Sequence, residues 1–254
     1  MSKEHMLVIG GSKGTGRAIV QTMAEKGYTL SVISRTKPQE ECENAAYWAV
    51  DITKGEALAE ALEQIVTQKG RINHLVFCQQ FRGTEDDWQG QIDTSLTATK
   101  SIIESAGSLF DEAKGNASIT MIGSSASHFI AKEKSVGYHV VKAGLEQMIR
   151  YYALVLAPRG IRVNGLSPNT ILKEENRDFY RRTKELHDLN TRVSPLGRMV
   201  TSEDVAHGVA FLCSPHAGAV TGQSLVMDGG ASLQEHAGLA RALKSLDKIE
   251  ITQG

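Results

Sequence analysis

Residues 6–20, MLVIGGSKGTGRAIV, join a short apolar run, a glycine-rich loop and the beginning of a helix-compatible segment. Glycine permits a tight turn and a close approach of the backbone to a ligand, and a helix N-terminus offers free N–H groups and partial positive charge. A plain strand-to-helix turn is the alternative, but the order of strand, loop and helix favours a site for a dinucleotide pyrophosphate. The residues predicted to contact that group are Gly10, Ser12, Lys13, Gly14, Thr15 and Gly16.

The same alternation of apolar and amphipathic segments continues along the chain. Apolar runs at residues 28–34, 47–50, 74–77, 118–123, 161–167 and 224–230 are separated by helix-length segments, one of them running from about residue 88 to 113. Strands that alternate with helices form right-handed βαβ units, which build a parallel sheet with helices on both faces. The pattern therefore predicts a doubly wound α/β fold that binds its ligands outside the carboxyl ends of the strands.

Composition and charge limit the class of protein. The chain has 254 residues and a formal net charge of -1, without a Lys/Arg block, so neither nucleic acid nor an anionic membrane is expected as a partner. Cys42, Cys78 and Cys213 are scattered and lack a metal-ligand spacing, which predicts no metal site and fits a reducing compartment. No run approaches the roughly 20 apolar residues of a membrane span, and a cytoplasmic protein is expected.

No linker or repeat interrupts the pattern, so residues 1–231 are predicted to form one domain. Residues 232–254 are predicted to form a C-terminal extension, in which Leu239, Leu243 and Leu246 are compatible with one amphipathic helix. That extension is either an interface element or a frayed tail.

The second apolar run ends in VISRTK, at residues 32–37, and indicates which dinucleotide is preferred. A site for NAD usually has an acidic residue here, against the ribose hydroxyls. Arg35, together with Lys13, would instead neutralise a 2′-phosphate, which favours NADP(H); two solvated surface cations are the alternative. Asp51, with Ile52 beside it, is placed to bind the adenine edge, although an Asp before Thr is also an ordinary helix cap.

The stretch GYHVVKAG, at residues 137–144, places Tyr138 and Lys142 four residues apart on one helix face. An ammonium about 4 Å away, at an effective dielectric of about 20, stabilises a phenolate by about 4 kcal/mol, or about 3 pKa units. The pair is therefore a candidate for proton exchange. Two long side chains at the rim of a buried helix are the alternative.

Taken in order, the glycine loop, GSS ending at Ser125, YHVVK, IRVNGLSPN and VTGQSLVMDGG resemble the short-chain dehydrogenase/reductase family from about Met6 to Gly230. The resemblance implies a Rossmann-like sheet of about seven strands and a nicotinamide cofactor. It implies that Ser125 orients a carbonyl, that Tyr138 exchanges the proton, and that Lys142 binds the ribose and tunes Tyr138. It also implies a homodimer or homotetramer.

The expected activity is an NADPH-dependent carbonyl reductase, or the reverse alcohol dehydrogenase, acting on a small molecule. An enoyl-type reductase usually has a longer Tyr-to-Lys spacing than YxxxK, so the sequence speaks against it. Substrate identity and reaction direction stay open. The charged residues 169–193 are expected to form a substrate lid, in which Arg177, Arg181 and Arg182 either attract an anion or form a solvated helix face. Phe179 and Tyr180 would line an apolar pocket.

Departures from the family pattern support a second candidate. The segment FCQQ, at residues 77–80, replaces the small residues of NNAG, and Ser95 stands where an Asn usually holds a relay water. These changes leave open a catalytically silent NADP(H)-binding scaffold or sensor. His128 and His139 flank the expected substrate mouth and are interpreted as packing or surface residues rather than as a second acid/base.

Overall fold

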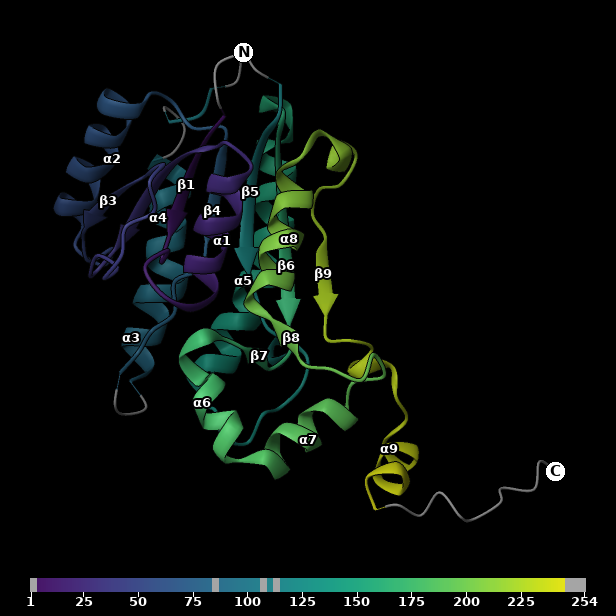
Figure 1. Cartoon of the computed structure of the whole chain (residues 1–254). Helices are drawn as coiled ribbons and strands as arrows, with labels where there is room; N and C mark the ends of the chain where they lie inside the picture. The colour runs from purple at the N-terminus through teal and green to yellow at the C-terminus, as the bar shows by residue number, and fades with distance from the viewer. Residues whose placement is uncertain (1–3, 84–86, 106–108, 112–114, 245–254) are drawn as a thin grey trace.

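The computed structural model describes residues 4–83, 87–105, 109–111 and 115–244. Seven strands form one parallel sheet in the order β3-β2-β1-β4-β5-β6-β9 (Figure 1). This arrangement confirms the predicted doubly wound α/β fold. The strands are β1 (His5–Ile9), β2 (Thr29–Ser34), β3 (Ala45–Ala49), β4 (His74–Phe77), β5 (Ala117–Ile122), β6 (Ile161–Pro168) and β9 (Ser224–Met227).

The strand order reverses beside β1, which pairs in parallel with β2 on one side and with β4 on the other. Ile9, the last residue of β1, is the register partner of both Ile33 and Phe77. In open α/β sheets ligands bind at such a reversal, outside the carboxyl ends of the strands. The glycine loop follows β1 and therefore begins at this point.

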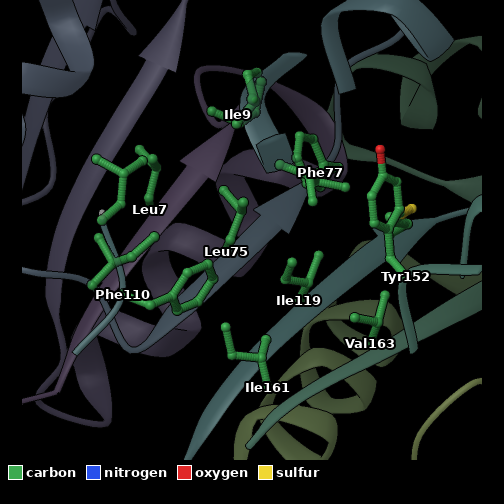
Figure 2. Packing of buried hydrophobic residues seen from close by; sticks show 14 of the residues in the cluster. Leu7, Ile9, Leu75, Phe77, Phe110, Ile119, Tyr152, Ile161 and Val163 are labelled. Carbon is green, nitrogen blue, oxygen red and sulfur yellow. The ribbon is translucent and has the colours of Figure 1, made fainter. Parts of the chain in front are cut away.

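Alternate residues of β1 pack into two separate cores. Leu7 and Ile9 contact one core, which includes helices α2 (Gly55–Lys69), α4 (Ala98–Ser105) and α5 (Val136–Leu156). Met6 and Val8 belong to the other, with α1 (Gly14–Glu25) and α8 (Ser202–Cys213). Because successive side chains of a strand point to opposite faces, a strand buried on both sides reads as a continuous apolar run. Figure 2 shows the first core, where Leu75 and Ile119 lie between Phe110 and Tyr152.

The long segment after β4 is not one regular helix. It consists of α3 (Trp88–Ile92), a π-helical turn at Asp93–Thr97, and α4. The expectation of a helix to about residue 113 is wrong at Leu109 and Phe110, since Phe110 forms a parallel β-bridge with Ile72. Phe110 is buried, so the core draws this residue out of the helical pattern. Ala113 itself lies outside the described residues.

The segment expected to form a substrate lid, residues 169–193 and called the lid below, contains two helices, α6 (Glu174–Arg182) and α7 (Lys184–Arg192). A small parallel pair, β7 (Ile171–Leu172) with β8 (Val200–Thr201), leads into it at the carboxyl end of the main sheet (Figure 1). Short 3₁₀ turns lie at Ser125–Ser127, Ala157–Arg159, Pro215–Ala217 and Ala231–Leu233. The C-terminal extension contains α9 (His236–Leu243), while its residues 245–254, with Leu246, lie outside the described residues. Within the described ranges, no helix has both the length and the apolarity of a membrane-crossing segment.

Candidate cofactor and active site

A cavity of about 1370 Å³ opens at the carboxyl ends of the strands. It exceeds the roughly 300–1,000 Å³ of common small-molecule sites, so its size suits a ligand larger than a typical small molecule. Most residues predicted for the site line it: Gly10, Ser12, Lys13, Thr15, Gly16, Arg35, Asp51, Ile52, Ser125, Tyr138 and Lys142. Gly14 and Ser95 do not line it.

The glycine loop has no room for side chains at two positions. Gly10 has a φ of +87°, and a Cβ atom there would lie 2.7 Å from the backbone nitrogen of Gln79. A Cβ atom on Gly16 would lie 2.1 Å from the carbonyl oxygen of Gly10. The loop therefore folds tightly against itself and against the end of β4, which brings bare backbone to the cavity. This arrangement fits a dinucleotide pyrophosphate at the N-terminus of α1.

The lid reaches the glycine loop through two charged side chains. The backbone amide of Gly14 donates a hydrogen bond to the carboxylate of Glu175, in the first turn of α6. The Cδ atom of Lys173 lies 3.4 Å from the position that a Gly14 Cβ would take, so its side chain crosses the loop. Burial lowers the pKa of Lys173, and the nearby Arg82 guanidinium adds to the effect. Sequence reasoning did not single out either lid residue.

The predicted 2′-phosphate ligands lie on the cavity wall beyond the end of β2. Lys13 and Arg35 are both exposed, and neither forms a salt bridge with another described residue. Asp51 also lines the cavity, but its carboxylate Oδ1 accepts hydrogen bonds from the backbone N–H and the hydroxyl of Thr53, at 3.0 and 2.8 Å. These bonds lower the pKa of Asp51. Asp51 therefore forms a local turn, three residues before the N-cap Lys54 of α2.

Tyr138 lies in the first turn of α5, where the Ser135 hydroxyl accepts a hydrogen bond from its backbone amide at 3.3 Å. The ammonium of Lys142 lies 5.8 Å from the centre of the Tyr138 ring and donates a 2.9 Å hydrogen bond to the Ile122 carbonyl oxygen. Lys134, from the preceding loop, lies 5.9 Å from the same ring centre. The predicted pair is thus brought together, one helical turn apart.

The pKa of Tyr138 does not fall as the spacing to Lys142 predicts, but moves in the opposite direction. Burial raises the pKa of the phenol, and a hydrogen bond with Ser124 only partly opposes this effect. Burial also lowers the pKa of Lys142, to about 8, because the low-dielectric surroundings disfavour its charged form. Desolvation therefore outweighs the effect of Ser124 at Tyr138, and at Lys142 it outweighs the attraction to Cys78 and Glu146.

Of the two serines, Ser124 is the one whose side chain lowers the pKa of Tyr138. Its hydroxyl also accepts from the Ala126 amide at 3.2 Å, which fixes it at the end of β5. Ser125 starts the 3₁₀ turn, where its carbonyl oxygen accepts from the amides of His128 and Phe129. Both serines line the cavity. The GSS motif places the two serines next to each other, and the sequence alone does not indicate which of them acts on Tyr138.

Ser95 is buried in the π-helical turn with 4% of its surface exposed. Its carbonyl oxygen accepts a 2.7 Å hydrogen bond from the Thr99 hydroxyl, which in turn accepts from the side-chain amide of Gln79 at 2.7 Å. Ser95 and Gln79 of FCQQ, which both depart from the family pattern, are thus linked through Thr99. The irregular turn is present although Ser replaces the usual Asn, while Thr94 and Asp93 are the residues of that turn that line the cavity.

His139 is a packing residue, as interpreted from the sequence. Its Nδ1 lies 2.8 Å from the Ser135 carbonyl oxygen, and its Nε2 accepts from the Ala131 amide at 3.0 Å. Both ring nitrogens are therefore committed to the backbone. The exposed His128 bonds the Ser127 hydroxyl through Nδ1 at 2.7 Å.

Two of the three arginines of α6, Arg177 and Arg181, are paired within their own helix. Arg177 forms a 2.9 Å salt bridge with Glu174, and Arg181 forms one with Asp178 at the same distance. These contacts match a solvated helix face, whereas Phe179 and Tyr180 line the cavity as expected. In the described part of the chain, no group of three His, Cys, Asp or Glu side chains has the arrangement of a metal site.

Comparisons with known proteins agree with this geometry. The family model described as "Enoyl-(Acyl carrier protein) reductase" matches residues 10–232. The human 3-oxoacyl-[acyl-carrier-protein] reductase is 33% identical over 242 residues, which cover 89% of this chain and 97% of that protein. Glucose 1-dehydrogenase 2 of Bacillus subtilis is 28% identical over 246 residues, covering 89% and 94%.

A solved short-chain dehydrogenase from Leptospira borgpetersenii, with bound NAD+, superposes with a TM-score of 0.78 at 26% identity. The superposition covers 91% of this chain and 93% of that one. Such proteins are oxidoreductases that bind a nicotinamide cofactor at the carboxyl ends of the strands, where the cavity lies here. The extent of the family match, together with the fold and the cavity, identifies this chain as a member of the short-chain dehydrogenase/reductase family.

Proposed function

We propose that this oxidoreductase transfers hydride between NADP(H) and a carbonyl or secondary alcohol substrate, with Tyr138 exchanging the proton. The observation that carries the proposal is the position of the Tyr138 phenol. Tyr138 lines the cavity, the Ser124 side chain acts on its pKa, and the Lys142 ammonium lies one helical turn away. This is the geometry expected for a general acid acting on a carbonyl oxygen.

The shifted pKa values support the direction of reduction. Burial raises the pKa of Tyr138, so the phenol is protonated at neutral pH and serves as a proton donor. As the proton leaves, the Lys142 ammonium stabilises the phenolate, because charge interactions are strong in a site of low dielectric. The Ser124 hydroxyl donates to the same substrate oxygen and steadies its developing charge. A bound nicotinamide supplies the hydride.

NADP(H) is proposed over NAD(H) because of the charges around the adenosine end. Lys13 and Arg35 offer two cations on the cavity wall that other described residues leave unpaired. An arginine holds a phosphate through two parallel N–H donors, and a second cation adds to the attraction. No carboxylate follows β2 at Ser34 or Arg35 to bind a free ribose hydroxyl.

The substrate is proposed to be a carbonyl compound rather than an enoyl compound, despite the description of the matching family model. Tyr138 and Lys142 are one turn apart, as the YxxxK spacing requires. The rival candidate is a silent NADP(H)-binding scaffold. It is supported by Gln79, which lies just after β4 at a position where the family usually has a small residue. The side-chain oxygen of Gln79 is buried and has no hydrogen-bond partner among the described residues. The intact Tyr138 site favours the enzyme.

The test is an assay of NADPH oxidation with ketones, open-chain sugars, 3-oxoacyl thioesters and an enoyl thioester, together with the Tyr138→Phe variant. We expect turnover of a carbonyl compound, and we expect Tyr138→Phe to abolish it while NADPH binding stays within about tenfold. An unchanged rate in the variant would exclude Tyr138 as the acid. A wild type that binds NADPH but is inert on the whole panel would favour the scaffold.

A homodimer or homotetramer in the cytoplasm is also proposed. Helix α5 exposes several large apolar side chains, which suit a contact with a second copy. These are Val136, Val140, Tyr151, Leu154 and Val155. Sedimentation at micromolar concentration tests the assembly, and a monomer would contradict it.

A further inference from the structure

A side-chain carboxylate of the same chain is hydrogen-bonded to the N-terminus of α1. Helix α1 has no acidic residue in its own first turn, yet the Gly14 amide donates to the Glu175 carboxylate of α6. The two residues are 161 positions apart in the sequence, so the contact depends on the fold of the lid. A carboxylate at this place binds the same N–H groups and the same partial positive charge that favour a phosphate.

Lys173 brings a cation to the same place. Its side chain lies over Gly14, and its backbone N–H donates a 2.7 Å hydrogen bond to the Asn176 side chain, which caps the start of α6. Burial, Arg82 and Lys134 all disfavour the charged form of Lys173, and only part of this is offset by Glu175 and Cys78. The positive charge around Gly14 therefore exceeds the negative charge that the Glu175 carboxylate supplies.

We propose that Glu175 is an internal competitor of the cofactor pyrophosphate at the glycine loop, and that Lys173 is a pyrophosphate-binding residue carried by the lid. The proposal rests on the proposed function. Entry of the dinucleotide displaces the Glu175 carboxylate from the Gly14 amide. Lys173 stays beside the loop and pairs with the incoming phosphates, so cofactor binding moves the segment that also covers the substrate.

The expected pattern differs from that of the 2′-phosphate ligands. NADPH and NADH carry the same pyrophosphate, so changes at Glu175 and Lys173 affect the binding of both coenzymes equally. Changes at Arg35 affect NADPH alone, because only NADPH has the 2′-phosphate. The ratio of the two dissociation constants thus separates the lid residues from residues that select the coenzyme.

The experiment is a titration of nicotinamide fluorescence with NADPH and with NADH, on the full-length chain. We expect Glu175→Gln to tighten both dissociation constants by about threefold to tenfold, because the competing charge is removed. We expect Lys173→Met to weaken both by about tenfold and to reduce the salt dependence of binding. Glu174→Gln, one residue earlier in the same helical turn, is the matched control and should leave both constants unchanged.

A measurement without cofactor checks the contact itself. In ¹⁵N spectra, the Gly14 amide signal should shift in Glu175→Gln and stay in place in Glu174→Gln. If both coenzymes bind and Glu175→Gln has the same dissociation constants as the wild type, the competitor role of Glu175 is overturned. The proposed function is not affected by that result. A wild type that binds neither coenzyme would overturn the proposed function together with that role. Thermal melting verifies that each variant is folded.

Discussion

Lys142 and Tyr138 lie one turn apart on α5, with the ammonium nitrogen 5.8 Å from the ring centre, yet their pKa values do not move as a simple ion pair would predict. Burial raises the pKa of the phenol and lowers that of the ammonium to about 8. The Ile122 carbonyl oxygen holds the ammonium in place at 2.9 Å. The two groups are thus arranged as a protonated acid with a cation whose charge is lost just above neutral pH.

The pH dependence of reduction follows from the Lys142 pKa. Above about pH 8 the ammonium loses its proton and no longer stabilises the phenolate of Tyr138. We expect kcat/KM for carbonyl reduction, which reports the free enzyme, to fall about tenfold per pH unit above this value. A steady-state profile from about pH 6 to about pH 10 measures the fall. A profile that stays flat to about pH 9.5 while the protein remains folded would contradict the role of Lys142.

Ser124 and Ser125 form a natural pair of matched variants. Ser124→Ala removes the hydroxyl that contacts Tyr138, and we expect kcat to fall by about 10²- to 10³-fold, as for the loss of one donor to a developing oxyanion. Ser125→Ala should leave kcat within about twofold, since the hydrogen bonds that Ser125 accepts from His128 and Phe129 end on its backbone carbonyl. The reverse ranking would restore Ser125 as the carbonyl-orienting residue.

The proposed coenzyme preference rests on Lys13 and Arg35, the two cations on the cavity wall beyond β2. We expect Arg35→Ala to weaken NADPH binding by about 10- to 100-fold, because a charge-assisted hydrogen bond contributes about 1.5–3 kcal/mol, and to leave NADH binding unchanged. Lys37→Ala, two residues later and paired with Glu41 at 3.5 Å, is the control. Titration of both coenzymes measures the effect. Equal losses for NADPH and NADH would show that Arg35 does not recognise the 2′-phosphate.

The buried His74 and the partly buried Glu4, at the opposite end of the sheet, are expected to contribute to stability as an ion pair. His74 Nε2 lies 3.5 Å from the Glu4 carboxylate. A hydrogen bond from His74 lowers the pKa of Glu4 from 4.5 to about 2. Burial lowers the pKa of His74, but hydrogen bonds with Cys213 and Glu4 prevail and raise it from 6.5 to about 9. The Glu4 contribution is thus complete above pH 4.5 and lost as pH falls through 2, whereas that of His74 is complete below 6.5 and lost as pH rises through 9.

We therefore expect Glu4→Gln to reduce the free energy of unfolding by about 1 to 3 kcal/mol near pH 6, the cost of a buried group that loses its charged partner. The loss should shrink above pH 9, where His74 is neutral. Urea unfolding at several pH values measures both effects, with the exposed Glu43→Gln as control. A pH-independent difference would mean that the ion pair does not contribute.

The sequence by itself determined the fold, and it placed most of the site. Apolar runs such as residues 6–9 must be buried on both sides, and glycines at positions 10 and 16 leave room only for backbone, so the fold class and the position of the loop follow from local chemistry. The four-residue spacing of Tyr138 and Lys142 likewise fixed their shared face. These properties depend on residues that are close together in the chain, so they can be predicted from the sequence.

Tertiary structure alone decided which serine meets Tyr138, how far burial moves the pKa values, and which anion occupies the glycine loop. Ser124 caps the 3₁₀ turn after β5 and its side chain affects the pKa of Tyr138, but no local pattern distinguishes it from Ser125. Desolvation of Lys142 depends on every element packed around α5. Its effect on the Lys142 pKa could therefore not be predicted from the spacing between Tyr138 and Lys142 alone. The contact between Gly14 and Glu175 joins residues 161 positions apart, and only the folding of the lid over the sheet brings them together.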